Sequence, residues 1–208
     1  MLALGGAADV EIGLLYARGA PGKRFPGRPW LREAMTLLEG RAALHVCGEQ
    51  ARRELMDGQL HDLTRLAARV QVNGDPSLDE AAAIAPAVRS LITQHQDANA
   101  ALLGLAAGNH SLLVDRSGGR GVLPSRWERP ATAKPVGFAG GLALHNLALQ
   151  LRLIATVARG DWWIDLEQHL RKDDWFDVTL AAAAVDLFRD ILATPFVLRQ
   201  RHRYDPPA

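Results

Sequence analysis

The sequence is poor in cysteine, and Cys47 is the single thiol among its 208 residues. Because one thiol cannot form an internal disulfide, the sequence excludes a small secreted scaffold held together by disulfides. Such sparing use of cysteine is typical of proteins in a reducing compartment, so we expect a cytoplasmic protein.

The sequence also lacks an excess of charge of either sign and lacks a long hydrophobic run. Lys+Arg 24 against Asp+Glu 23 gives a formal net charge of +1, so no bulk field favours nucleic acid or an anionic membrane. The opening stretch MLALGGAADVEIGLLY has no basic segment, and Asp9 and Glu11 interrupt its apolar run. This pattern excludes a signal peptide and a membrane span, and we expect neither a nucleic-acid nor a membrane partner.

What the sequence does contain is an alternation of short apolar runs with longer stretches of helical periodicity. Its 48% hydrophobic and 23% charged residues are ordinary for one globular domain, here residues 1–208. Continuous apolar runs between helices are typical of parallel strands covered on both faces, which predicts an α/β fold. The expected strands are Val10–Ala17, Ala43–Gly48, Arg69–Gly74, Ser90–His95, Ser111–Arg116, Lys134–Gly141 and Trp162–Glu167. The expected helices are Trp30–Glu39, Leu78–Val88, Asn99–Ala107, Leu144–Arg159 and a last one from Val178 to Leu192.

Polar residues gather where the apolar runs end. In parallel α/β folds ligands bind beyond the carboxyl ends of the strands, and in a barrel those ends meet at one rim. We therefore expect a site at such a rim; the competing interpretation is that these residues simply begin surface loops. The residues are Cys47, Asn73, Gln94, His95, Asp115, Gly140, Gly141, Asp165 and Glu167.

Two glycine-rich turns follow neighbouring strands in the late part of the chain. The first reads D-R-S-G-G-R-G from Asp115 to Gly121, and the second is the pair Gly140–Gly141 just before a helix. Glycines allow the backbone to approach an anion and direct successive N–H groups toward it, and a helix N-terminus adds further donors. The two turns together predict a phosphate site.

Five spaced motifs occur in a fixed order along nearly the whole chain: EIGLLYA with KRFP, VQVNG, LLVDRSGGRG with Trp127, GFAGGLALHNL, and WIDLEQHLRKDDWFDV. In this order they resemble the phosphoribosylanthranilate isomerase family of tryptophan biosynthesis, a (β/α)8 TIM barrel. The second motif has Asn73 where a histidine is common in the family.

The resemblance implies an Amadori rearrangement of a phosphoribosyl-amine by general acid–base catalysis, with no cofactor and no metal. Asp115 occupies the position of the family's general acid, and Arg24 that of the arginine that binds the aglycone carboxylate. An arginine fork is well suited to a carboxylate. The phosphate would bind the backbone N–H groups of Gly119, Gly121, Gly140 and Gly141.

The chain departs from the family pattern at the general base. That base is a cysteine on the first strand, whereas this chain resembles the family only from the end of the first helix. Cys47 is the candidate replacement, and the competing interpretation makes it a small buried hydrophobe. A Ser-Gly that completes the phosphate site in the family reads Gln168–His169 here, so we expect His169 to donate a hydrogen bond to phosphate.

These departures leave alternatives open. A barrel without its first strand has two open edges, which a later-than-native start codon, a partner or a homodimer would explain. The chain is then either an isomerase or a noncatalytic paralogue that binds a phosphorylated ligand or a protein. A metal site at His45 and Cys47, two apart on one strand face, has too few ligands to be expected.

Overall fold

A computed structural model describes residues 10–19 and 21–193 of the chain, apart from the side chain of Leu192. The predictions that concern the first nine residues lie outside this part. No helix in the described ranges is long and apolar enough to cross a membrane.

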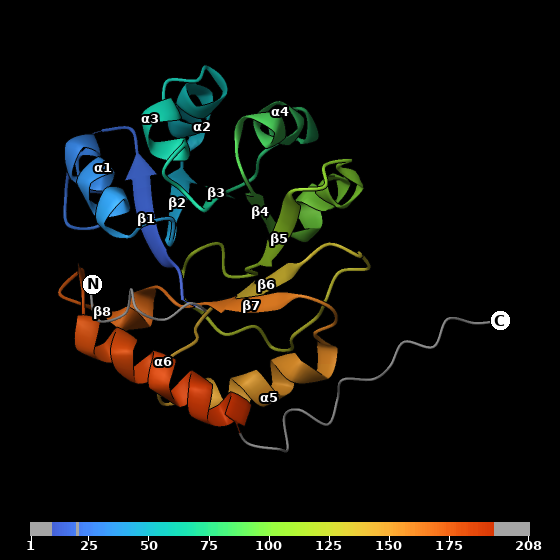
Figure 1. Ribbon diagram of the computed structural model, residues 1–208. Coiled ribbons are helices and arrows are strands. Elements are labelled where there is room, and N and C mark those ends of the chain that lie inside the picture. Colours follow the sequence, from blue (N-terminus) through green and yellow to red (C-terminus); the bar gives the residue numbers. More distant parts are fainter. Residues whose placement is uncertain (1–9, 20, 194–208) are drawn as a thin grey trace.

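Seven parallel strands form one sheet in sequence order, and each pairs with the next along the chain (Figure 1). All seven predicted strands are confirmed, with ends that move by a few residues. They are β1 (Ile12–Ala17), β2 (Ala42–Cys47), β3 (Arg69–Asn73), β4 (Leu91–His95), β5 (His110–Val114), β6 (Val136–Ala139) and β7 (Trp162–Asp165).

Helices connect most of these strands, and α5 and α6 lie together along the side of β6 and β7 (Figure 1). The helix expected over Asn99–Ala107 is instead a 3-10 segment, η2, over Asp97–Gly104. The helices are α1 (Arg28–Leu37), α2 (Glu49–Met56), α3 (His61–Thr64), α4 (Leu78–Ile84), η1 (Ala85–Ala87), η2, α5 (Leu147–Val157), η3 (Gln168–Leu170) and α6 (Val178–Ala193). A small hairpin of β8 (Arg171–Lys172) and β9 (Trp175–Phe176) precedes α6.

Side chains alternate along each strand between the helical layer and the barrel interior. On β2, Leu44 and Val46 are completely buried in the main hydrophobic cluster, whereas His45 points to the other face and contacts Gln71 of β3. The adjacent Trp162 and Trp163 also separate: Trp162 packs edge-on against Phe138, and Trp163 packs with an inner cluster. The interior is therefore a mixed polar and apolar space that opens at the carboxyl ends of the strands.

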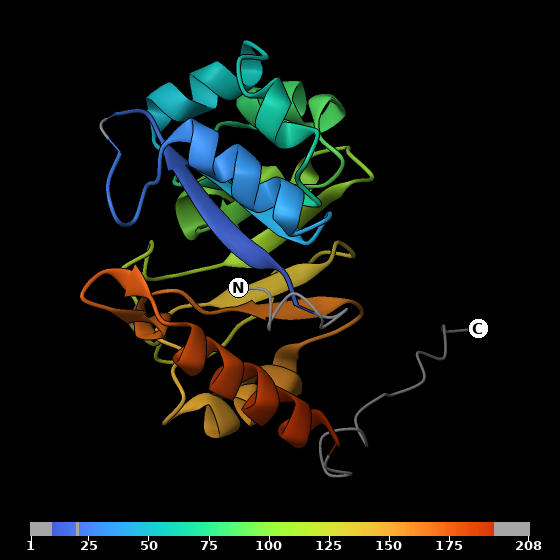
Figure 2. The ribbon, with the colours of Figure 1, turned by 60° about the vertical axis from the view of Figure 1, so that its left-hand side comes forward.

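The barrel is open between its two edge strands, β1 and β7. A cavity of about 400 Å³ lies there, lined by residues of both strands together with α6 and Phe176 of the hairpin. Figure 2 shows α6 running below these strands. The architecture is an incomplete (β/α)8 barrel, as the sequence predicts.

His110, at the start of β5, gives the fold a sensitivity to acid. The side chain is 2% exposed and its Nε2 lies 2.9 Å from Thr93 Oγ1. Burial lowers the pKa of His110 to about 4, and the nearby Lys134 acts in the same direction. A histidine with a lowered pKa contributes stability that is present above its unfolded value of about 6.5 and is lost as pH falls toward 4.

We therefore expect the free energy of unfolding to decrease as pH is lowered from 7 to 4.5. In His110→Gln this decrease should be smaller than in wild type by about 2–3 kcal/mol. Urea unfolding at the two pH values measures it. The control is His61→Gln on the exposed side of α3. An equal acid-induced loss in wild type and His110→Gln would contradict the expectation.

Candidate active site

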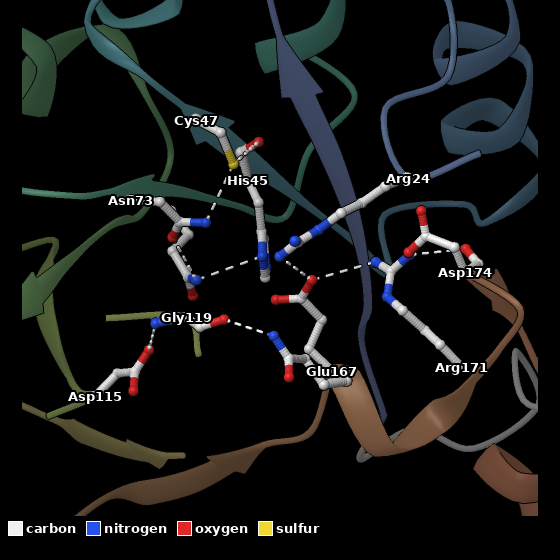
Figure 3. Close-up of polar contacts among 11 residues, drawn as sticks. Arg24, His45, Cys47, Asn73, Asp115, Gly119, Glu167, Arg171 and Asp174 are labelled. Carbon is white, nitrogen blue, oxygen red and sulfur yellow. Dashed lines mark hydrogen bonds and ion pairs between the residues drawn. The ribbon is translucent and has the colours of Figure 1, made fainter. Parts of the chain in front are cut away.

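A cavity of about 330 Å³ opens at the carboxyl ends of the strands, inside the barrel rim. All eight residues predicted for the site line it, although they come from separate strands and loops. They are Arg24, Cys47, Asp115, Gly119, Gly121, Gly140, Gly141 and His169. Several of them are drawn in Figure 3. Their convergence on one cavity is a structural fact, and their chemical roles remain predictions.

Asp115 directly follows β5 and is 4% exposed. Its Oδ1 accepts hydrogen bonds from Ser117 N at 3.0 Å and Ser117 Oγ at 2.7 Å, and its Oδ2 accepts one from Gly119 N at 2.7 Å. The carboxylate therefore fixes the start of the glycine loop and lines the cavity at the same time.

The second glycine turn packs tightly against the first loop. Gly141 has φ +64°, and a Cβ there would overlap the backbone nitrogen of Leu123. The turn is also fixed from the helix side, where Asn146 accepts a hydrogen bond from Ala143 N at 3.0 Å and donates one to Gly141 O at 2.9 Å. Only glycine combines this backbone conformation with so close an approach.

Gln168 contacts the glycine loop, which the sequence did not predict. Its Nε2 donates a hydrogen bond to Gly119 O at 2.8 Å, and its side chain lies so close to Gly121 that a Cβ there would overlap it. The neighbouring His169 is exposed at the cavity mouth, with its ring centroid 6.3 Å from that of His145. His169 and both glycine turns line the same cavity.

Arg24 is held by an acidic residue that is distant in sequence. Its Nη2 lies 2.7 Å from Glu167 Oε1, and Glu167 is also 3.2 Å from Arg171 Nη2 (Figure 3). Arg24 Nε is buried and has no hydrogen-bond partner within the described residues. A ligand carboxylate at Arg24 would compete with Glu167 for the guanidinium group.

Cys47 sits at the end of β2 in an amide-rich environment. Its Sγ accepts a hydrogen bond from Asn73 Nδ2 at 3.3 Å. Burial raises the pKa of the Cys47 thiol, an effect that the hydrogen bond from Asn73 opposes. Because the thiolate is the reactive form, this surrounding does not activate the thiol as a base.

Asp165, which the sequence placed at the rim without a role, has a carboxyl group with a strongly raised pKa. Burial raises the pKa of Asp165 to about 6 and the charge of Asp115 acts in the same direction, whereas Gln71 and Arg69 oppose the shift. The sequence held one indication that Asp165 belongs to a site, because Asp165 and Glu167 lie two residues apart at the end of a predicted strand.

His45 and Cys47 lie two residues apart on β2 and so share one face of the strand. Burial lowers the pKa of His45 to about 4, and its Nδ1 lies 3.3 Å from Gln71 Nε2. Among the described residues no group of three or more His, Cys, Asp or Glu side chains is placed to hold a metal ion.

The parallel barrel and its rim cavity define the class of protein: a (β/α)-barrel protein with a cavity at the carboxyl ends of its strands. No family model and no curated sequence matches the chain. Solved structures do match it. Phosphoribosyl anthranilate isomerase from Thermus thermophilus superposes with a TM-score of 0.66 at 18% identity, covering 91% of this chain and 93% of that chain.

Two further structures agree. TrpF from Jonesia denitrificans gives a TM-score of 0.63 at 14% identity, with 88% of each chain covered. Monomers generated from the dimeric phosphoribosylanthranilate isomerase of Thermotoga maritima give 0.58 at 14% identity, with 84% of each chain covered. The resemblance that the motifs indicate is thereby confirmed at the level of the fold.

Proposed function

We propose that this chain is a phosphoribosylanthranilate isomerase-like enzyme of tryptophan biosynthesis in the cytoplasm. It rearranges a phosphoribosyl-amine to an aminodeoxyribulose phosphate. The observation that carries the proposal is the convergence of Asp115, two glycine turns and Arg24 on one rim cavity. These are the groups that a phosphorylated sugar-amine with an aromatic carboxylate needs, and the solved structures that share the fold bear the same enzyme name.

Each group has a distinct part in the proposed reaction. Backbone N–H groups of Gly119, Gly121, Gly140 and Gly141 bind the phosphate, and His169 donates a further hydrogen bond at the mouth. Arg24 binds the aglycone carboxylate through its fork. Asp115 protonates the ribose ring oxygen as the C–O bond breaks, which opens the ring. The reaction needs no cofactor, because ring opening and the removal of the C2 proton both proceed by general acid–base catalysis.

Growth of a tryptophan auxotroph that lacks its own isomerase tests this function. We expect the gene for this chain to restore growth without tryptophan, and the Asp115→Asn gene to fail at equal protein levels. Absence of growth with well-expressed wild-type protein, combined with retained binding of a phosphate ester, would favour the noncatalytic paralogue instead.

We further propose that a homodimer covers the open edge of the barrel. Trp175, Phe176 and Val178 are exposed by 59%, 41% and 36% beside this edge, and Phe176 also lines the cavity between β1 and β7. Contiguous exposed apolar side chains commonly mark an interaction surface. The Thermotoga maritima protein is described as dimeric.

Light scattering coupled to size exclusion measures this assembly. We expect wild type to have twice the 22.6 kDa chain mass and Phe176→Glu to have the mass of one chain. The matched control is Leu149→Glu on α5, a site that is also 59% exposed. A wild-type chain that stays monomeric at all concentrations would contradict the dimer.

A further inference from the structure

The reaction proposed above needs a base as well as an acid, and the site residues inferred from the sequence leave that role without a suitable group. Cys47 lies at the end of β2, and burial raises the pKa of its thiol. Asp115 is already engaged at both oxygens by Ser117 and Gly119. A second carboxylate that faces the same cavity would complete the pair.

The strand register places Asp165 in that position. Ala139 of β6 pairs with Asp165 of β7, and Val114 of β5 pairs with Phe138, so Asp115, Ala139 and Asp165 follow one another across three neighbouring strands. Adjacent strands lie about 4.8 Å apart, which puts the backbones of the two aspartates roughly 10 Å from each other. All three residues line the rim cavity.

The residue between the two aspartates is small. Because Ala139 has only a methyl group, the space between the carboxyl groups of Asp115 and Asp165 is left to the cavity. Two carboxyl groups that flank a substrate from strands two apart in the sheet can serve opposite ends of one proton-transfer sequence.

We propose that Asp165 is the general base of this site, a catalytic residue that takes the C2 proton of the ring-opened substrate. This inference rests on the proposed function. It assigns to a residue at the end of β7 the role that the resemblance gives to a cysteine on the family's first strand.

The step balances without any further reactant. After ring opening the substrate is an iminium with a C1=N bond. The Asp165 carboxylate takes the proton from C2, the C2–H electron pair forms a C1=C2 bond, and the C1=N pair returns to nitrogen. The resulting enolamine then gains a proton at C1 and loses its hydroxyl proton, which yields the ketone.

The pKa of Asp165 reflects surroundings in which Asp115 is ionised, whereas in the proposed reaction Asp115 carries the proton and Asp165 the charge. Burial and the charge of Asp115 raise its pKa to about 6, against the opposing effects of Gln71 and Arg69 on β3. Other charged or titratable groups that line the two cavities touching Asp165 are Arg24, Cys47, Glu167 and His169 at the rim and Glu11, His45 and Arg171 at the open edge. A base with a pKa just below the working pH is ionised yet strong enough to accept a proton.

The test compares Asp165→Asn with wild type and with Asp161→Asn, an exposed aspartate in the turn before β7. We expect Asp165→Asn to lower kcat by about 10²-fold or more while KM changes little, and Asp161→Asn to behave like wild type. The kcat/KM of wild type should rise with pH through about 6, as expected for a base with the pKa of Asp165.

Folding of the variant is checked independently of activity. A raised carboxyl pKa means that the charged form destabilises the fold, so stability is lost as pH rises through about 6. Asp165→Asn removes this charge, so its midpoint of thermal unfolding should exceed that of wild type at pH 8, and the difference should shrink as pH falls toward about 4. Carbon-13 NMR of the Asp165 carboxyl should also show a pKa that falls in Asp115→Asn.

The outcomes separate the two proposals. A wild-type chain with no turnover overturns the proposed function, and this inference with it. Turnover in wild type that survives Asp165→Asn within threefold overturns the inference alone, and loss of activity in Cys47→Ser instead would assign the base to the thiol.

Discussion

Asp115→Asn is expected to reduce kcat/KM for phosphoribosylanthranilate by about 10³-fold or more. The substitution removes the proposed general acid, and it also removes the acceptor for Gly119 N, because an amide nitrogen replaces Oδ2. Ser117 can still donate to the remaining oxygen through both its N–H and its hydroxyl group. Chemistry should therefore suffer far more than folding.

Steady-state kinetics and thermal unfolding together measure this effect. The matched control is Asp186→Asn on the exposed side of α6, which changes the net charge equally and lies outside the rim cavity. Turnover of Asp115→Asn within a few-fold of wild type would remove Asp115 from the role of acid.

Gly141→Ala is expected to weaken phosphate-ester binding at least tenfold. The substitution forces an L-residue to φ +64°, which costs about 1–2 kcal/mol, and it pushes a Cβ into the backbone of Val122 and Leu123. Either the turn or the glycine loop must move, and both contribute N–H groups to the proposed phosphate site.

The control variant Gly160→Ala separates the cost of backbone strain from the cost of steric overlap. Gly160 has nearly the same backbone angle, φ +61°, but a Cβ there would meet nothing within 4 Å. It should lose a similar amount of stability from strain and keep its affinity for phosphate esters. Calorimetric titration of both variants measures the difference, and equal affinities would show that the second glycine turn takes no part in binding.

The strands were predictable because each one is a short apolar run, and β2, β5 and β6 are buried on both faces nearly throughout. The helix α2 was missed since its sequence, EQARRELM, is mostly polar and buries only Ala51, Leu55 and the carboxyl-bearing Glu54. The hairpin of β8 and β9 was missed for a related reason, because two strands of two residues each carry no periodicity.

The residues around the cavity were predictable from their place at strand ends, whereas their partners were not. The ion pair between Arg24 and Glu167 joins positions 143 residues apart, and the bond from Gln168 to Gly119 spans 49 residues. Asp165 is the clearest example of a residue whose partners the sequence did not predict. Its pKa depends on Asp115, Gln71 and Arg69, which only the strand register brings near it.

The measurement that tests the account most directly is the decay of phosphoribosylanthranilate fluorescence when the purified chain is added. The account predicts decay that depends on protein concentration, is absent in Asp115→Asn, and yields a product that retains both the phosphate and the anthranilate carboxylate. No decay above the spontaneous rate at any protein concentration from pH 6 to pH 8 would contradict it.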